Sequence, residues 1–281
     1  MSFSMVRLKQ MLRYGLPFIL SGTLFYLLTY ADRYFIINYG SVADLGLYYI
    51  GLSLAGIITL LFAGFQQAWS PILWSTYQDR DAKQFYSKLL DYAFSLSILA
   101  IAAISLFSRE ILMVLTTTDY LESYQVVPWL AFSILFSQVF SLFVPGINIA
   151  KKTIHYVWRG AVAVTVNIVL NFLLVPKYGI VGAAAATLAA AAISYVLILV
   201  MSQRYYPIQF NFLNYLKITS IAVVTLLLWH TFFLEISWQN ILIKVGFMLI
   251  LLLSIFAFGT IGKAELKATK EIAIKYFKQL R

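Results

Sequence analysis

Long apolar runs, each close to 20 residues, recur along nearly the whole of this sequence. A helix of that length matches the thickness of the hydrocarbon core of a bilayer. Of the 281 residues, 62% are hydrophobic and 11% are charged, whereas a soluble domain keeps about a quarter of its residues charged. The sequence therefore predicts an all-α integral membrane protein, because a helix satisfies its own backbone hydrogen bonds in lipid.

The apolar runs predict about eight transmembrane helices. They cover approximately residues 14–39, 46–74, 89–107, 126–149, 154–175, 180–201, 212–234 and 241–261. The stretch GIVGAAAATLAAAAIS carries almost nothing but small side chains, which predicts close helix packing inside a bundle. The tail 263–281 is basic and amphipathic, and we expect it on an anionic membrane surface.

The placement of Lys and Arg predicts the orientation of these helices. All but four of the 21 basic residues fall on the side that carries the N-terminus, the exceptions being Arg33, Arg109, Lys177 and Lys244. Because positive loops stay in the cytoplasm, both termini are predicted to be cytoplasmic. The net charge of +10 does not indicate nucleic-acid binding, since its basic residues are scattered among apolar runs.

The residue types exclude several kinds of chemistry. The sequence has no cysteine, and its two histidines, His155 and His230, lie far apart. It therefore offers no disulfide framework, thiol nucleophile or clustered metal ligands. A phosphate-binding G-x-x-x-x-G-K-[ST] motif is also missing from the sequence. We expect no metal site, no cofactor and no catalytic residues.

Two neighbouring charges, Asp32 and Arg33, lie inside the first apolar run. Asp32 is about 10 Å from the outer end of that helix at 1.5 Å per residue, and a charge at such depth is a functional hypothesis by default. Helical spacing puts Asp32 on one face with Ser21 and Thr29. Arg33 faces about 100° away, and its long side chain can reach the headgroups. Asp32 is too short to do so, which favours a cavity or a partner beside it.

A second polar stripe follows the 154–175 segment. Arg159, Asn167 and Asn171 recur at helical spacing, and Lys151 and Lys152 precede them. One interpretation is a basic mouth that leads into a polar path. The alternative is an Arg anchor at the cytoplasmic side together with buried amides that join helices. A third candidate, Gln66, precedes Pro71 and either faces inward from a kinked helix or belongs to an interfacial belt.

Several local motifs occur in a characteristic order. LPFILSGTLFYLLTYADRYFI contains the Leu16–Pro17 and Asp32–Arg33 pairs, and LGLYYIGLSLAGIITLLFAGFQQAWSPIL contains the Gly46-Leu47-Tyr48 turn and Pro71. VPKYGIVGAAAATLAAAAISY follows at 175–195. Together these motifs resemble the second half of bacterial polysaccharide flippases. Those proteins translocate O-antigen and capsule repeat units and belong to the multidrug/oligosaccharidyl-lipid/polysaccharide exporter superfamily.

The resemblance implies a domain organisation. Residues 1–203 would form one six-helix transporter lobe, 204–262 two additional transmembrane helices, and 263–281 the cytoplasmic tail. Members of the family place two such lobes around a central cavity and alternate its access between the two sides. The matching motifs belong to the second lobe. We therefore expect an N-terminal lobe in a longer reading frame or in a separate chain, or else a second copy of this chain.

The resemblance also implies a function. The family moves undecaprenyl-diphosphate-linked oligosaccharides across the cytoplasmic membrane, so the expected partners are that lipid-linked oligosaccharide and membrane lipids. The expected partners of the diphosphate are Arg33, Arg159, Lys151 and Lys152, because ion pairs are strong in a low dielectric. Ser21, Thr29, Asn167 and Asn171 would line the sugar path, and Gln66 is a further candidate for substrate binding. Asp32 would neutralise Arg33 or exchange a proton.

Other functions remain open from the residues. A membrane enzyme of polysaccharide assembly, such as a polymerase or a glycosyltransferase, would need a clustered acid and base. The short 108–127 segment offers only Arg109, Glu110, Asp119 and Glu122. Within transport, a lipid II flippase and a drug/cation antiporter are the alternatives.

Overall fold

A computed structural model describes residues 4–138, 142, 144–232 and 238–257 of the chain. The predicted tail at 263–281 lies outside these residues. The described part is helical throughout, with elements α1 (Met5–Tyr39), α2 (Val42–Thr76), α3 (Ala82–Leu106), α4 (Ser108–Leu115), the 3-10 helix η1 (Thr118–Gln125), α5 (Val127–Gln138), α6 (Pro145–Ile149), α7 (Ile154–Tyr205), α8 (Phe212–Phe232) and α9 (Trp238–Ala257).

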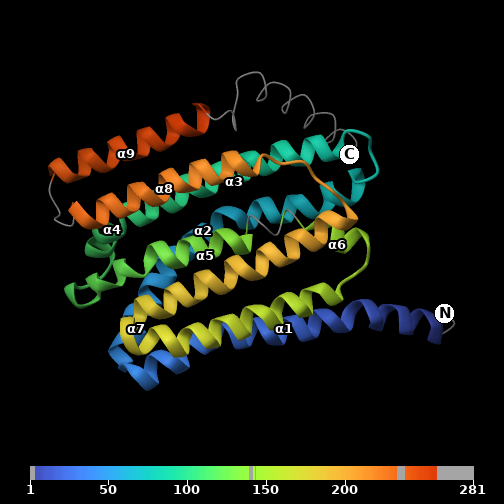
Figure 1. Ribbon diagram of the computed structural model, residues 1–281, viewed down its shortest axis with the longest axis horizontal. Coiled ribbons are helices and arrows are strands. Elements are labelled where there is room, and N and C mark those ends of the chain that lie inside the picture. The colour runs from blue at the N-terminus through green and yellow to red at the C-terminus, as the bar shows by residue number, and fades with distance from the viewer. Residues whose placement is uncertain (1–3, 139–141, 143, 233–237, 258–281) are drawn as a thin grey trace.

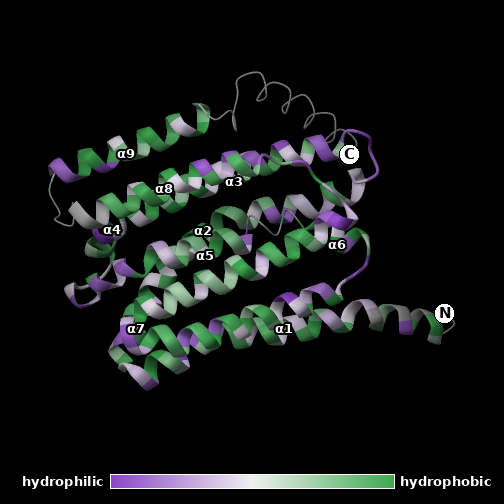
Figure 2. Ribbon diagram, viewed as in Figure 1, coloured by the Kyte–Doolittle hydropathy of each residue, from purple (hydrophilic) through white to green (hydrophobic). Residues whose placement is uncertain are grey.

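The helices run side by side along the long axis of the molecule (Figure 1). Five of the described helices are long and apolar enough to cross a membrane, namely α1, α2, α3, α7 and α9, while α5 and α8 contain shorter apolar helices. Hydrophobic residues cover most of their length (Figure 2). The predicted class, an all-α multi-pass membrane protein, is confirmed.

A tight turn joins α1 to α2. Ser41 caps α2, because its hydroxyl accepts from the backbone N–H of Asp44 while the Asp44 carboxylate accepts from the Ser41 backbone N–H. This capping box satisfies two donors that the first turn of a helix otherwise leaves unpaired. Gly40 precedes it, and a Cβ there would lie 2.8 Å from Asp44 Oδ2 and 2.9 Å from the Ile36 carbonyl oxygen. The turn thus brings α2 back alongside α1.

The 52 residues of α7 form two helices that meet at a sharp bend. Gly179 has φ +53° and ψ −133°, a backbone conformation open to glycine. Figure 1 shows the first half of α7 lying beside α1 and the second half returning along the bundle. At Gly182 a Cβ would come within 2.5 Å of the Leu174 carbonyl oxygen, so a side chain there would separate the two halves. The predicted helices 154–175 and 180–201 correspond to these halves.

One sequence prediction about the middle of the chain is wrong. The predicted helix 126–149 is interrupted, since α5 ends at Gln138 and α6 begins separately at Pro145. Proline disfavours the helical conformation of the residue before it, and Val144 indeed has φ −107° and ψ 27°. The segment 108–127, which the predicted helices leave as a connection, contains α4 and η1. The strong amphipathic pattern of SREILMVL is the signal that was missed.

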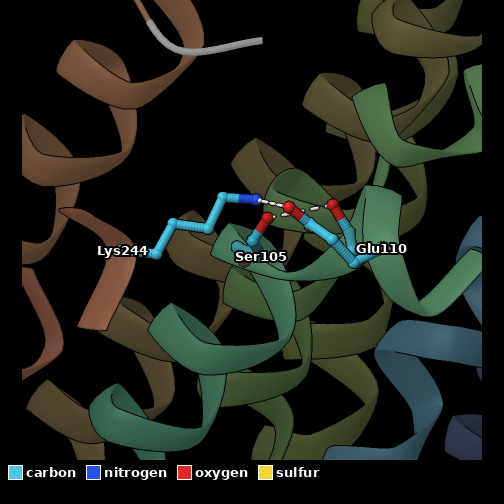
Figure 3. Close-up of polar contacts among 4 residues, drawn as sticks. Ser105, Glu110 and Lys244 are labelled. Atoms are coloured by element: carbon cyan, nitrogen blue, oxygen red, sulfur yellow. Dashed lines mark hydrogen bonds and ion pairs between the residues drawn. The ribbon is translucent and has the colours of Figure 1, made fainter. Parts of the chain in front are cut away.

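The helices α8 and α9 pack against α3, on the side of the bundle away from α1 (Figure 1). An ion pair anchors α9 there: Lys244 of α9 binds Glu110 of α4 (Figure 3). Lys244 is 1% exposed, although it lies in a helix whose buried residues are otherwise Leu251 and Ile255. Nearer the other end of the same interface, the Tyr215 hydroxyl of α8 donates to Asp91 of α3 at 2.5 Å.

Candidate functional site

A carboxylate forms the centre of an extensive polar cluster in the described residues. Asp32, in α1, is only 4% exposed. Its neighbours come from three other segments: Tyr48 from α2, Asn167 and Asn171 from the first half of α7, and Thr187 from the second half. The bend at Gly179 is what brings Thr187 back to this position. Residues far apart in the sequence therefore surround a single buried acid.

Each oxygen of Asp32 accepts two hydrogen bonds. Oδ2 accepts from the Tyr48 hydroxyl at 2.6 Å and from the Thr187 hydroxyl at 2.5 Å. Oδ1 accepts from the amide nitrogens of Asn167 at 3.0 Å and Asn171 at 2.8 Å. Hydrogen bonds to an ionised group are about twice as strong as neutral ones. Four of them offset the cost of burying a carboxylate, and all four come from neutral side chains.

The amides of this cluster have spare acceptor capacity. Asn171 Nδ2 donates to Asp32 and to the carbonyl and side-chain oxygens of Asn167, while Asn171 Oδ1 is buried without a partner among the described residues. A buried acceptor left unpaired costs about 1–3 kcal/mol. The cluster thus combines the carboxylate of Asp32 with nearby hydroxyl and amide oxygens. One of them, Asn171 Oδ1, is an acceptor without a partner among the described residues. That chemistry suits a proton or a small cation.

Arg33, the next residue in the chain, lies away from this cluster. Its guanidinium stacks between two rings, with its Cζ 4.1 Å from the Tyr30 centroid and 4.5 Å from the Tyr49 centroid. Arg33 and Asp32 face different directions because successive helical residues are about 100° apart. The expected neutralisation of Arg33 by Asp32 does not occur in this arrangement: the four donors to Asp32 are Tyr48, Asn167, Asn171 and Thr187.

A cavity of about 280 Å³ lies between α1 and the first half of α7. Its walls are mainly apolar, with Ser21, Tyr156 and Arg159 as polar residues. The Arg159 guanidinium lies 4.0 Å from the centroid of the Tyr195 ring. Its Nε is buried without a partner in the described part of the chain. The cavity therefore holds a fixed positive charge with donor capacity.

The other predicted residues fall outside this cavity. Lys151 and Lys152 are exposed at the turn that precedes α7. Near them the His155 ring nitrogen Nε2 lies 3.1 Å from the Tyr205 hydroxyl, which ties the first turn of α7 to its last residue. Gln66 is half-buried and donates a hydrogen bond to Gln138 of α5. The structure thus brings Asp32, Asn167 and Asn171 together and leaves the remaining predicted residues apart from them.

Sequence reasoning missed two members of the Asp32 cluster, Tyr48 and Thr187. Tyr48 belongs to the Gly46-Leu47-Tyr48 motif, which was predicted to be a turn but lies within α2; the motif itself did not indicate that Tyr48 contacts the acid. Thr187 is the only hydroxyl in the run GAAAATLAAAA. A single polar residue in such a run is a usable signal, because burying a hydroxyl without a partner is costly.

Some of the exposed residues on α1 and α2 are tyrosines or polar, although most of the large exposed side chains there are apolar. Tyr26, Tyr30 and Tyr34 are 65%, 51% and 67% exposed on α1. On α2 the polar side chains of Ser53, Gln67 and Ser70 are also exposed. Polar groups are costly against hydrocarbon. These tyrosines and polar side chains are therefore candidates for contact with a polar ligand.

Comparison with known proteins gives a family match for part of the chain. Residues 1–125 match the family model described as polysaccharide biosynthesis protein. The family expected from the motifs is therefore confirmed over these residues. No curated protein matches the sequence.

One solved structure with a similar chain is the lipid II flippase MurJ in an inward closed conformation. The two chains are 17% identical and superpose with a TM-score of 0.47, and the match covers 96% of this chain. It covers 53% of the flippase, so the chain spans about half the length of that protein.

Proposed function

We propose that this chain, whose residues 1–125 match the polysaccharide biosynthesis protein family, serves as one lobe of a flippase for lipid-linked oligosaccharides. The observation that carries the proposal is Arg159 in the cavity between α1 and α7. Its Nε is buried without a partner in the described residues, and the aromatic ring of Tyr195 holds the guanidinium in place. A diphosphate supplies the oxyanions that such a group binds.

In this proposal the diphosphate enters from the side of Lys151 and Lys152 and binds Arg159. The exposed tyrosines of α1 and the exposed polar side chains of α2 form one wall of the sugar path, and Gln66, Asn167 and Asn171 lie along or behind that wall. The polyprenyl tail stays in lipid. No covalent step is required, so the protein acts as a transporter and not as an enzyme, in a bacterial inner membrane.

The Asp32 cluster supports a second part of the proposal, coupling to an ion. A transporter needs a group whose state differs between its two conformations. Asp32 receives hydrogen bonds from both halves of α7 and from α2, so binding a proton or a monovalent cation there changes the bonds that hold three helices together. Asp32 is then a coupling residue, and the substrate binds elsewhere.

A single lobe supplies only one wall of a two-lobe cavity. We therefore propose a partner that completes it, either an N-terminal lobe of the same reading frame or a separate chain. The test is a liposome assay with a fluorescent undecaprenyl-diphosphate oligosaccharide, in which leaflet exchange is followed with and without a co-expressed six-helix lobe. Exchange is expected with both lobes and not with this chain alone.

The same assay separates cargo classes and tests the site. Lipid II and an organic cation are offered as competing cargoes, and preferential transport of either one contradicts the proposed substrate. Arg159→Ala is expected to abolish exchange. Arg204→Ala removes an exposed arginine at the end of α7 and serves as the matched control. Equal activity of the two variants would remove Arg159 from the site.

A further inference from the structure

The aromatic surface around Arg33 has no role in the coupling cluster or in the Arg159 cavity. Arg33 lies between the rings of Tyr30, three residues earlier in α1, and Tyr49 of α2. Stacking on two rings fixes the plane of a guanidinium and leaves its N–H donors directed outward at the edge. The side chain is therefore held in one orientation before any ligand arrives.

The Arg33 guanidinium forms no ion pair within the described residues. Asp32 accepts its four hydrogen bonds from other side chains, and no carboxylate contacts Arg33 among the described residues. Arg33 is six residues from the end of α1 at Tyr39, which places it about 9 Å inside that end at 1.5 Å per residue. A guanidinium without an ion pair at such depth favours an anionic ligand.

The same stripe of α1 offers flat aromatic surfaces beside this charge. The Tyr26 and Tyr30 rings are nearly parallel, with an interplanar angle of 9° and centroids 6.2 Å apart. Tyr26 is 65% exposed, and Tyr34, one turn beyond Tyr30, is 67% exposed. Tyrosine combines an apolar face with a hydroxyl. That combination suits a pyranose ring, which has an apolar C–H face and a rim of hydroxyls.

We infer that Tyr26, Tyr30, Arg33 and Tyr49 form a subsite for an acidic sugar, in which Arg33 binds an oxyanion carried by the sugar and the tyrosines bind its ring. The inference rests on the proposed function, because it assigns the head of the lipid-linked oligosaccharide to this surface. The oxyanion is either the carboxylate of a uronic acid or a phosphate on a sugar. Arg159 remains the partner of the diphosphate, on the other side of α1.

The test is a binding measurement on the full chain in phosphatidylcholine nanodiscs by ligand-observed NMR. The probes are a glucuronic-acid trisaccharide, a neutral trisaccharide of equal length, glucose 1-phosphate and inorganic phosphate. We expect saturation transfer to the ring protons of the acidic probes, with the better of the two identifying the oxyanion. The neutral trisaccharide is expected to bind at least about tenfold more weakly, because it lacks the charge-assisted bonds.

The variants separate charge, stacking and general surface effects. Arg33→Lys keeps the charge but loses the planar fork, and Tyr49→Leu removes one side of the stack; each is expected to weaken binding of the acidic probe about tenfold. Tyr39→Leu removes another exposed α1 tyrosine, which stacks on Phe35 and not on Arg33. This control is expected to bind like the unmodified chain.

Three results would overturn the inference. They are failure of both acidic sugars to bind, binding that Arg33→Lys leaves unchanged, and equal binding by the neutral trisaccharide. Inorganic phosphate that competes as well as the acidic sugars, or anionic phospholipid that displaces them from the nanodisc, would instead indicate a lipid-headgroup site. Leaflet exchange is measured separately from sugar binding. Exchange without sugar binding would keep the proposed function and rule out the subsite. Sugar binding without exchange would keep the subsite and rule out the proposed function.

Discussion

Asp32 and Arg33 are adjacent in the sequence, but their side chains belong to different environments. The Asp32 carboxylate is buried against α2 and both halves of α7. The Arg33 guanidinium stacks on Tyr30 and Tyr49 at the surface shared by α1 and α2. The two charges therefore have different surroundings: Asp32 is buried inside the lobe, and Arg33 is half-buried at its surface. Substitutions at the two positions should have different consequences.

Asp32→Asn is expected to destabilise the lobe and to abolish ion dependence of transport. The new amide nitrogen is a donor that faces the donors of Tyr48, Thr187 and the two asparagines. Leaving buried donors unpaired costs about 1–3 kcal/mol each, so the thermal unfolding temperature in detergent should fall. The dependence of leaflet exchange on pH and on sodium is the second readout.

The control for this prediction is Asp119→Asn, at an exposed residue of η1. An Asp32→Asn protein whose unfolding temperature and ion dependence are both unchanged would contradict the coupling role.

Gly22→Leu is expected to block transport without unfolding the protein. Gly22 lines the Arg159 cavity, and a Cβ added there meets nothing within 4 Å. A leucine therefore fits the helix but occupies space that the proposed substrate needs. We expect a loss of at least about tenfold in exchange rate, equivalent to about 1.4 kcal/mol of binding. Gly15→Leu is the matched control, since its Cβ is equally open but lies outside the cavity; a similar loss in both variants would show that the cavity is not the cause.

Gly182→Ala is expected to disturb the hairpin of α7 and, through it, the Asp32 cluster. The added Cβ would lie 2.5 Å from the Leu174 carbonyl oxygen and 2.7 Å from its carbon. Both contacts are backbone, so one half of α7 must move, at a cost of about 1–3 kcal/mol. Thr187 moves with the second half. Gly56→Ala in α2, which meets open space, is the control, and equal unfolding temperatures of the two variants would contradict the close approach at Gly182.

The pair Lys244 and Glu110 is expected to fix α9 on the bundle. Lys244→Met alone or Glu110→Gln alone leaves one buried charge without its partner, which costs about 3–5 kcal/mol. The double variant should recover much of that loss, and the exchanged pair Glu110→Lys with Lys244→Glu should recover part of it. Thermal unfolding of all four proteins measures the coupling. Additive losses in the double variant would show that the two side chains act independently.

Local sequence carries much of this structure because helical spacing is a local property. The apolar runs alone indicate an all-α membrane protein, and Asn167 and Asn171 share a face because they are four residues apart. Asp32 and Arg33 face different directions because successive helical residues are about 100° apart. Interrupted helices are harder to predict: the break before Pro145 and the helix α4 lie in segments whose composition resembles that of their surroundings.

What the sequence could not decide is which helix faces meet. Spacing indicated that Asp32 needs a partner, and its partners proved to be Tyr48 from α2 and Thr187 from beyond the bend at Gly179. Those contacts depend on the α1–α2 turn and on the α7 hairpin, which bring together residues up to 155 positions apart. By itself the sequence determined the membrane class and the face of each polar residue. Only the tertiary structure decided that Asp32 is bound within its own lobe while Arg33 is half-buried against two rings at the lobe surface, because packing geometry and not residue spacing selects a side chain's neighbours.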